Sequence, residues 1–305
     1  MHRRTFLASS SAALVAGALH DWPLFAQGRP SKPQTKFSEL RNGTGIFTGR
    51  GGTIGWLVTD EGAVVVDSQF PGTAETCLDG IKSRSRRGIH VLINTHHHGD
   101  HTAGNKIFRP AAKFIVAHAN SSEWQRMVAE QAKTGAEQAY PDQTFPNVWQ
   151  LKIGGERVTA TYYGFAHTSG DVAVTFEAAN VVHMGDLVFN RFHPYIDREA
   201  GASIANWITV LDRVPREHNA ETTYIFGHGK DGAGVTGSRA DLARFRDYLT
   251  ALLDYTKKQI AAGKSREAIT KATALRGFEE YEAPDPPDVS LATALGTAYD
   301  ELTGA

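Results

Sequence analysis

Cysteine is nearly absent from this 305-residue chain, and the single Cys77 excludes both an internal disulfide and a metal site made of paired cysteines. Any metal must therefore be held by nitrogen and oxygen atoms. Cys77 lies in the helix-compatible stretch TAETCLDGIK. Because free cysteine is among the most buried residue types, we expect it to be a small apolar residue of the core.

A surplus of charge is also lacking. The formal net charge is −1, with 21% charged and 41% hydrophobic residues, which is typical of a soluble globular protein. This balance gives no indication of nucleic acid or an anionic membrane as a partner. The one basic run, KSRSRR at Lys82–Arg87, is interpreted as the exposed end of a helix. Composition does not indicate an oligomeric state.

The first residues read as a targeting segment rather than as part of the fold. Arg3 and Arg4 are followed by Thr5 and a weakly apolar stretch that carries no charge up to His20, too short to cross a bilayer alone. The adjacent arginines resemble a twin-arginine signal, which implies a bacterial protein exported in the folded state to the periplasm or the medium. We expect residues 1–26 to hold this signal and the start of a linker, with cleavage after Ala16-Gly17-Ala18 or Ala26 and no membrane anchor afterwards.

The remaining chain, 27–305, is expected to be one α/β domain with a helical C-terminal extension from about 237 to 305. Apolar runs bounded by turn residues predict buried strands at 54–58, 63–67, 90–94 and 114–117, and further strands at 157–165, 171–186 and 222–229. Helix-compatible spacing predicts helices after residues 73 and 120, and at 203–214, 237–262 and 290–302. Strands interrupted by helices in both halves suggest two sheets with helices outside.

The stretch NTHHHGDHTAGN, Asn94–Asn105, packs four histidines and an aspartate directly behind a predicted buried strand. In an extended segment alternate side chains point the same way, so His96, His98 and Asp100 are expected to converge while His97 points elsewhere. His101 should follow at a bend that Gly99 makes easier. Neutral imidazoles are common zinc ligands, and a divalent cation removes the repulsion between clustered histidines.

Three later residues occupy similar positions behind predicted strands, each with glycine close by: His167 in GFAHTSGD, Asp186 in HMGDLVF and His228 in IFGHGK. Singly, each fits a turn residue as well as a functional one. As a set they indicate one site at a sheet edge.

This ordered series resembles the metallo-β-lactamase fold superfamily from about Gly45 to His228. The resemblance implies a four-layer αβ/βα sandwich with two metals in a groove at one sheet edge. The resemblance also assigns each candidate residue to a metal. His96, His98 and His167 would bind the first metal, Asp100, His101 and His228 would bind the second, and Asp186 would bridge the two. Asp67 matches an acidic residue that supports the metal loop. His97 matches no ligand.

In its aspartate at the bridging position the chain resembles glyoxalase II and lactonases, whereas the best-known metallo-β-lactamases have cysteine or serine there. Two zinc ions are the expected cofactors, with iron or manganese as alternatives. We hypothesise that a hydroxide between the metals attacks an ester, lactone, thioester or amide carbonyl of a small molecule, and that Asp100 orients it and shuttles its proton.

Substrate contacts are expected from loops around the groove. The candidate side chains are Phe70, Trp124, Arg191, His193, Tyr195 and Lys230. Arginine or lysine would hold a substrate carboxylate, and the aromatic residues would line the groove.

Three other functions stay open: a β-lactam-hydrolysing enzyme of the same fold, an iron-dependent oxidoreductase similar to persulfide dioxygenases, and a non-catalytic metal-binding protein. Persulfide dioxygenases normally use fewer ligands at the second position, so the complete set here disfavours that reading. Binding alone would not need open coordination positions, which disfavours the third.

Overall fold

The computed structural model describes residues 34–283 and 289–305, so the expected signal at 1–26 lies outside the described residues. The strands are β1 Lys36–Glu39, β2 Thr44–Thr48, β3 Ile54–Val58, β4 Ala63–Val66, β5 Ile89–Asn94, β6 Ala112–His118, β7 Gln143–Phe145, β8 Val148–Ile153, β9 Glu156–Tyr162, β10 Val172–Phe176, β11 Val181–His183, β12 Phe189–Asn190, β13 Thr223–Ile225, β14 His228–Gly229 and β15 Thr236–Gly237. The helices are α1 Pro71–Arg84, α2 Gly99–Thr102, α3 Asn105–Phe108, α4 Ala119–Gln131, α5 Ile204–Arg213, α6 Arg239–Ala261, α7 Arg266–Ile269 and α8 Leu291–Thr303, with short 3₁₀ turns η1 Gly135–Glu137, η2 Gly185–Leu187 and η3 Val214–Arg216.

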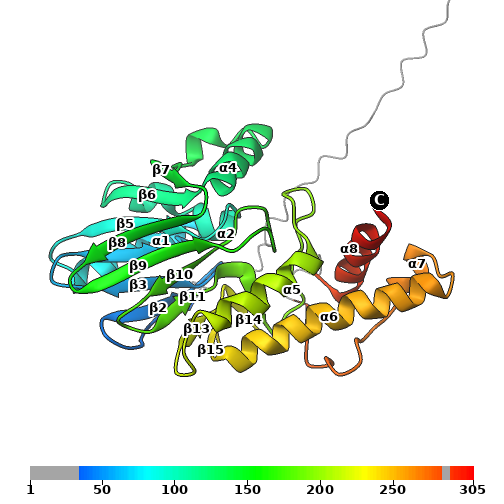
Figure 1. Ribbon diagram of the computed structural model, residues 1–305. Helices are drawn as coiled ribbons and strands as arrows, with labels where there is room; N and C mark the ends of the chain where they lie inside the picture. Colours follow the sequence, from blue (N-terminus) through cyan, green and yellow to red (C-terminus); the bar gives the residue numbers. More distant parts are fainter. Residues whose placement is uncertain (1–33, 284–288) are drawn as a thin grey trace, which may run out of the picture.

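Two sheets form the centre of the molecule (Figure 1). The first has the order β1-β2-β3-β4-β5-β6-β7, and β4 to β7 run parallel to one another. The second has the order β15-β13-β11-β10-β9-β8, in which β11 and β13 are parallel. Strands β12 and β14 form a small separate pair.

Three hydrophobic clusters show how the layers stack. Val64 and Val66 of β4 belong to the cluster shared with the second sheet, whereas Ala63 and Val65 pack with α1 on the opposite face. This alternation explains the unbroken apolar run of β4, because both faces of the strand are buried. On the far side of the second sheet, Trp207 of α5 and Phe245 of α6 pack together, with ring centroids 5.4 Å apart. The predicted four-layer αβ/βα sandwich is confirmed.

Helix α1 bears out two predictions about its residues. Cys77 is fully buried in the cluster beneath α1, and burial raises the pKa of its thiol, so it is an inert core residue. The basic residues of the run at the end of α1 are exposed, and the Arg84 guanidinium lies 4.1 Å from the Phe37 ring centroid.

Several local predictions are wrong in instructive ways. The expected strand at 171–186 is two strands, because the Glu156 carboxylate accepts hydrogen bonds from the amides of Ala178 and Ala179 and holds a turn there. Asp67 lies beyond β4 with a φ of 66°. Gly99 has no positive φ and simply begins α2, which ends the extended stretch before Asp100.

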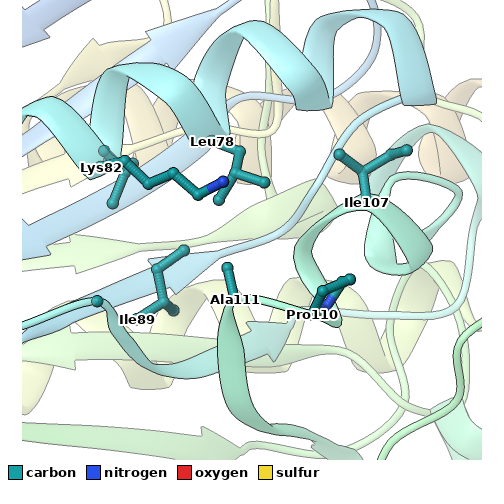
Figure 2. Close-up of a pocket in the computed structure, with 8 residues that line it drawn as sticks. Leu78, Lys82, Ile89, Ile107, Pro110 and Ala111 are labelled. Carbon is teal, nitrogen blue, oxygen red and sulfur yellow. The ribbon is translucent and has the colours of Figure 1, made fainter.

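A cavity of about 370 Å³ lies between α1 and the loop after α3, lined by Leu78, Ile89 and Ile107 among others (Figure 2). Ile89 begins β5, whereas the histidine run follows the other end of that strand, so the cavity is remote from it. No helix within the described ranges combines the length and apolar character that crossing a membrane requires.

Candidate metal centre

The predicted ligands come together because the strands that carry them end at one edge. The histidine run follows β5, Asp186 lies in η2 after β11, and His228 begins β14 shortly after β13. Strand β11 is parallel to β13, so their carboxyl ends lie side by side. His167 lies in the loop between β9 and β10.

His96, His98 and His167 form what we call the inner group. All three are buried, with exposures of 0 to 3%. The rings of His96 and His98 have centroids 4.7 Å apart, and His98 Nδ1 lies 2.9 Å from His167 Nε2. Asp186 Oδ2 is 3.8 Å from His96 Nε2 and 3.5 Å from His167 Nε2. These four side chains direct nitrogen or oxygen atoms into one small volume.

Asp100, His101 and His228 form the outer group. His228 Nε2 lies 3.0 Å from Asp100 Oδ2 and 3.3 Å from His101 Nε2. The His228 side chain is 22% exposed, so this group faces the opening of the site. Asp100 was expected to converge with His96 and His98; it belongs here instead, because α2 turns the chain after His98.

Asp186 contacts both groups. Its Oδ1 lies 3.0 Å from His101 Nε2, and its Oδ2 lies 3.4 Å from His228 Nε2 as well as near the inner imidazoles. Gly227 makes this position possible, since a Cβ there would lie 1.9 Å from Asp186 Oδ1. Gly52 likewise packs on His101, where a Cβ would come within 2.1 Å of the ring.

Asp67 and Thr95 fix the orientation of two imidazoles. Asp67 accepts hydrogen bonds from the Thr95 amide at 2.7 Å, from Thr95 Oγ1 at 2.8 Å and from His101 Nδ1 at 2.8 Å. Because the Thr95 hydroxyl gives its hydrogen to Asp67, it can only accept from His96 Nδ1, 3.1 Å away. In His96 the lone pair is therefore left on Nε2, which faces the site. Burial opposes charge on His101, but Asp186, Asp100 and Asp67 raise its pKa well above the usual value, and its Nε2 lies 3.0 Å from Asp186 Oδ1.

The electrostatics of the two groups differ. Burial, and secondarily His98, lower the pKa of His167 to about 3, so its imidazole is neutral at pH 7. Burial opposes ionisation of Asp100, but His101 and His228 outweigh it and hold the pKa at about 2. Burial also opposes charge on His228, yet Asp186 and Asp100 raise its pKa to about 10. Without a cation, the outer group is thus a protonated imidazole between carboxylates.

The inner group fits a metal ion on evidence from its own hydrogen bonds. Among the described residues the buried Nε2 of His96 has no hydrogen-bond partner. His167 Nδ1 donates to the carbonyl of Tyr195 at 2.8 Å, so its Nε2 presents a lone pair toward His98 Nδ1. A buried imidazole nitrogen without a partner is costly unless a cation lies beside it.

The proposed substrate residues fall into two sets, and the three aromatic residues Phe70, Trp124 and Tyr195 form the first, which lies beside the histidine run and its neighbouring loop. Tyr195 is 39% exposed and its ring lies 5.5 Å from that of His98. Trp124 stacks obliquely on His97 at 5.9 Å, and Phe70 lies beneath the Arg50 guanidinium at 4.7 Å, next to the loop that packs on Asp100.

The other three contact neighbouring protein groups. Arg191 pairs with Asp241 at 2.8 Å, and Lys230 pairs with Glu282. His193 is buried, and its Nδ1 lies 2.9 Å from the Tyr248 hydroxyl.

Sequence reasoning missed three residues around the site. Thr95 orients His96, and Asp197 Oδ2 lies 2.9 Å from His98 Nε2. Asp171 is buried and accepts from the amide and hydroxyl of Thr168, and burial raises its pKa to about 8. Thr95 and Asp171 lie inside the motifs NTHHHGDHTAGN and GFAHTSGD, so the sequence could have predicted them, whereas no pattern marks Asp197.

Comparison with known proteins agrees with this geometry. Residues 47–248 match the family model of the metallo-beta-lactamase superfamily. The chain is 30% identical over 132 residues to 2,4-dinitroanisole O-demethylase subunit alpha of Nocardioides sp. (strain JS1661), covering 43% of this chain and 39% of that protein. It is 23% identical over 174 residues to metallo-beta-lactamase IND-1 of Chryseobacterium indologenes, covering 57% and 70%.

A solved structure extends the similarity of fold. The inverting sec-alkylsulfatase Pisa1 from Pseudomonas sp. superposes with a TM-score of 0.68 at 15% identity, over 88% of this chain and 50% of that one. The chain therefore spans well under two thirds of the length of both the demethylase subunit and the sulfatase.

Proposed function

Because this chain belongs to the metallo-beta-lactamase superfamily, we propose that it is a dinuclear metal hydrolase with zinc as its metal. One observation carries the proposal: Asp186 lies within 3.5 Å of imidazole nitrogens of both donor groups, which is the arrangement that a carboxylate bridging two metals requires. A non-catalytic binder would have no use for a second, partly exposed donor group beside a complete inner one.

The donor set suits acyl hydrolysis. Bound zinc would supply a nucleophile at neutral pH by lowering the pKa of a water to about 7. Asp100, whose pKa of about 2 keeps it ionised, would accept a hydrogen bond from that water and orient it. The His167 imidazole, which is neutral because burial lowers its pKa to about 3, would hold its position without competing for the proton.

The substrate we propose is a small organic ester, lactone, thioester or amide. Two of the large apolar side chains that are most exposed among the described residues, Phe165 and Tyr195, belong to the segments that carry His167 and its backbone partner. The Tyr195 ring also lies 5.5 Å from that of His98, and an apolar ring beside a polar site favours an organic acyl compound. The lactamase relative makes a β-lactam the second candidate, as an amide that the same donors could attack.

Metal analysis and hydrolysis assays of Asp186→Ala test the proposal. The wild type should hold about two zinc ions per chain and hydrolyse members of an ester, lactone, thioester and β-lactam panel. The variant should lose metal and activity together. Asp212→Ala, on a half-exposed ion pair of α5 with Arg246, is the matched control and should change neither. Iron at about one per chain, unchanged in Asp186→Ala, would contradict the hydrolase and point to the iron-dependent oxidoreductase.

We also propose that the chain is exported by the twin-arginine route, on the strength of Arg3, Arg4 and the uncharged stretch behind them. The double variant Arg3→Lys, Arg4→Lys should accumulate in the cytoplasm of a bacterial host, whereas the wild type and the control Arg29→Lys should reach the periplasm. Unchanged export of the double variant would refute this route.

A further inference from the structure

One short segment, Tyr195 to Ala202, contacts two of the three inner histidines. The Tyr195 carbonyl accepts from His167 Nδ1 at 2.8 Å, and Asp197 Oδ2 lies 2.9 Å from His98 Nε2. Both contacts use the ring nitrogen that points away from the site. The opposite nitrogens, His98 Nδ1 and His167 Nε2, are thereby turned toward each other at 2.9 Å.

The Asp197 carboxylate is held in place independently of His98. Its other oxygen, Oδ1, accepts from the amide of Ala200 at 3.0 Å, and its backbone carbonyl accepts from the amide of Ala202 at 2.9 Å. The Ala200 carbonyl in turn accepts from the Ser169 amide at 2.8 Å, which ties the segment to the loop that carries His167. Asp197 is only 6% exposed, so water does not compete strongly for its oxygens.

We propose that Asp197 is a positioning residue that selects Nδ1 of His98 as the atom binding the inner metal, a role that rests on the proposed dinuclear function. A carboxylate can only accept, so the hydrogen of His98 is kept on Nε2 and the lone pair on Nδ1. His97 does not share this contact, because its Nε2 is 3.6 Å from the same oxygen, beyond hydrogen-bond distance.

Asp197→Asn tests the role with almost no change of shape. The amide oxygen is expected to stay with the Ala200 amide, which needs an acceptor, and the NH₂ group then faces His98 Nε2. This NH₂ group favours a lone pair on Nε2 and moves the hydrogen to Nδ1, where it blocks the metal. Zinc titrations of the metal-free proteins against a chromophoric chelator should show that the affinity of the tighter of the two zinc sites falls about 10- to 100-fold.

Controls separate positioning from a general structural effect. Asp197→Glu retains a carboxylate and should recover part of the zinc affinity. Asp212→Asn changes the half-exposed carboxyl of α5 that pairs with Arg246 and should match the wild type. The melting temperature of metal-free Asp197→Asn should stay close to that of the metal-free wild type even though the zinc affinity falls, because one hydrogen-bonded pair is exchanged for another.

The possible results are distinct. A wild type that binds no zinc overturns the dinuclear proposal, whereas a zinc-binding wild type matched by Asp197→Asn overturns only the role of Asp197. If the variant does not fold, ¹⁵N NMR of histidine-labelled, zinc-loaded wild type decides. Metal on Nδ1 and hydrogen on Nε2 of His98 support the inference, and the reverse assignment refutes it.

Discussion

The inner and outer groups are built from the same kinds of residue, yet they are prepared for metal in different ways. Each inner histidine has its far ring nitrogen engaged by Thr95, Asp197 or the Tyr195 carbonyl. In the outer group, Asp67 engages His101, while His228 stacks on Phe189 at 5.4 Å and is partly exposed. The inner imidazoles are therefore held in their binding orientation before a metal binds, whereas the orientation of His228 in the outer group would be fixed only when a metal binds.

Protonation sharpens this difference. The pKa of His167 lies at about 3, so metal entering the inner position displaces no proton from it near pH 7. The pKa of His228 is raised to about 10, so metal entering the outer position must expel one. The lesson is that a symmetrical-looking set of ligands is expected to load in sequence, inner before outer.

The largest effect should come from removing one ligand of each group. His167→Ala breaks the inner position and should lower kcat/KM by more than about 100-fold, beyond what the loss of a supporting partner costs. His228→Ala should lose activity too, but retain the inner zinc through dialysis. Zinc analysis of the dialysed proteins distinguishes them, and retention of metal in His167→Ala with loss in His228→Ala would reverse the comparison.

The pH dependence of zinc affinity should separate the groups next. His228 must lose its proton to bind, and its pKa is about 10, so outer affinity should rise about tenfold per pH unit between pH 6 and 9 for each proton displaced. Inner affinity should change little over that range because the pKa of His167 is already far below it. Calorimetric titrations in buffers of different ionisation enthalpy count the protons released in each step. Equal proton release in both steps would contradict the difference.

A smaller and selective effect is expected for Asp67→Asn. Asp67 is fully buried and accepts from three donors, so an amide group must place its NH₂ against one of them. Stability should fall by about 1–3 kcal/mol, measured by urea unfolding of the metal-free protein.

The same variant should weaken the outer zinc more than the inner one, because Asp67 contacts His101 directly and His96 only through Thr95. Asp60→Asn, on an exposed turn residue, is the matched control. An inner position weakened as much as the outer one would show that Asp67 supports both alike.

The sequence predicted the layers and the strand-end ligands because both depend on strong local patterns. The run AVVVD is apolar on both faces, and the histidine run follows a strand of the same kind. Strand β8 was missed because it lies at the sheet edge, and its alternating exposure makes VWQLKI look like an irregular polar segment.

Other parts of the site depend on contacts that no local pattern records. Asp197 lies 99 positions from His98 and reaches it only because the segment after Asp186 folds back over the histidine run. The alternation of an extended backbone wrongly grouped Asp100 with His98, because a single turn of helix, α2, replaces that backbone, whereas the family resemblance assigned Asp100 to the group of His101 and His228.

The smallest effect should come from Tyr195→Phe, which tests whether the Tyr195 side chain or its backbone holds His167 of the inner group. Tyr195 holds His167 through its backbone carbonyl, so loss of the phenol hydroxyl should leave zinc affinity unchanged. Burial raises the pKa of the phenol to about 12, so the hydroxyl is neutral and can contribute one ordinary hydrogen bond to substrate, about tenfold in kcat/KM at most. Michaelis–Menten kinetics and zinc titration check the two expectations separately. A fall in inner zinc affinity would mean that the phenol hydroxyl, and not the fixed backbone alone, supports His167, and the inner position would then be no better prepared than the outer one.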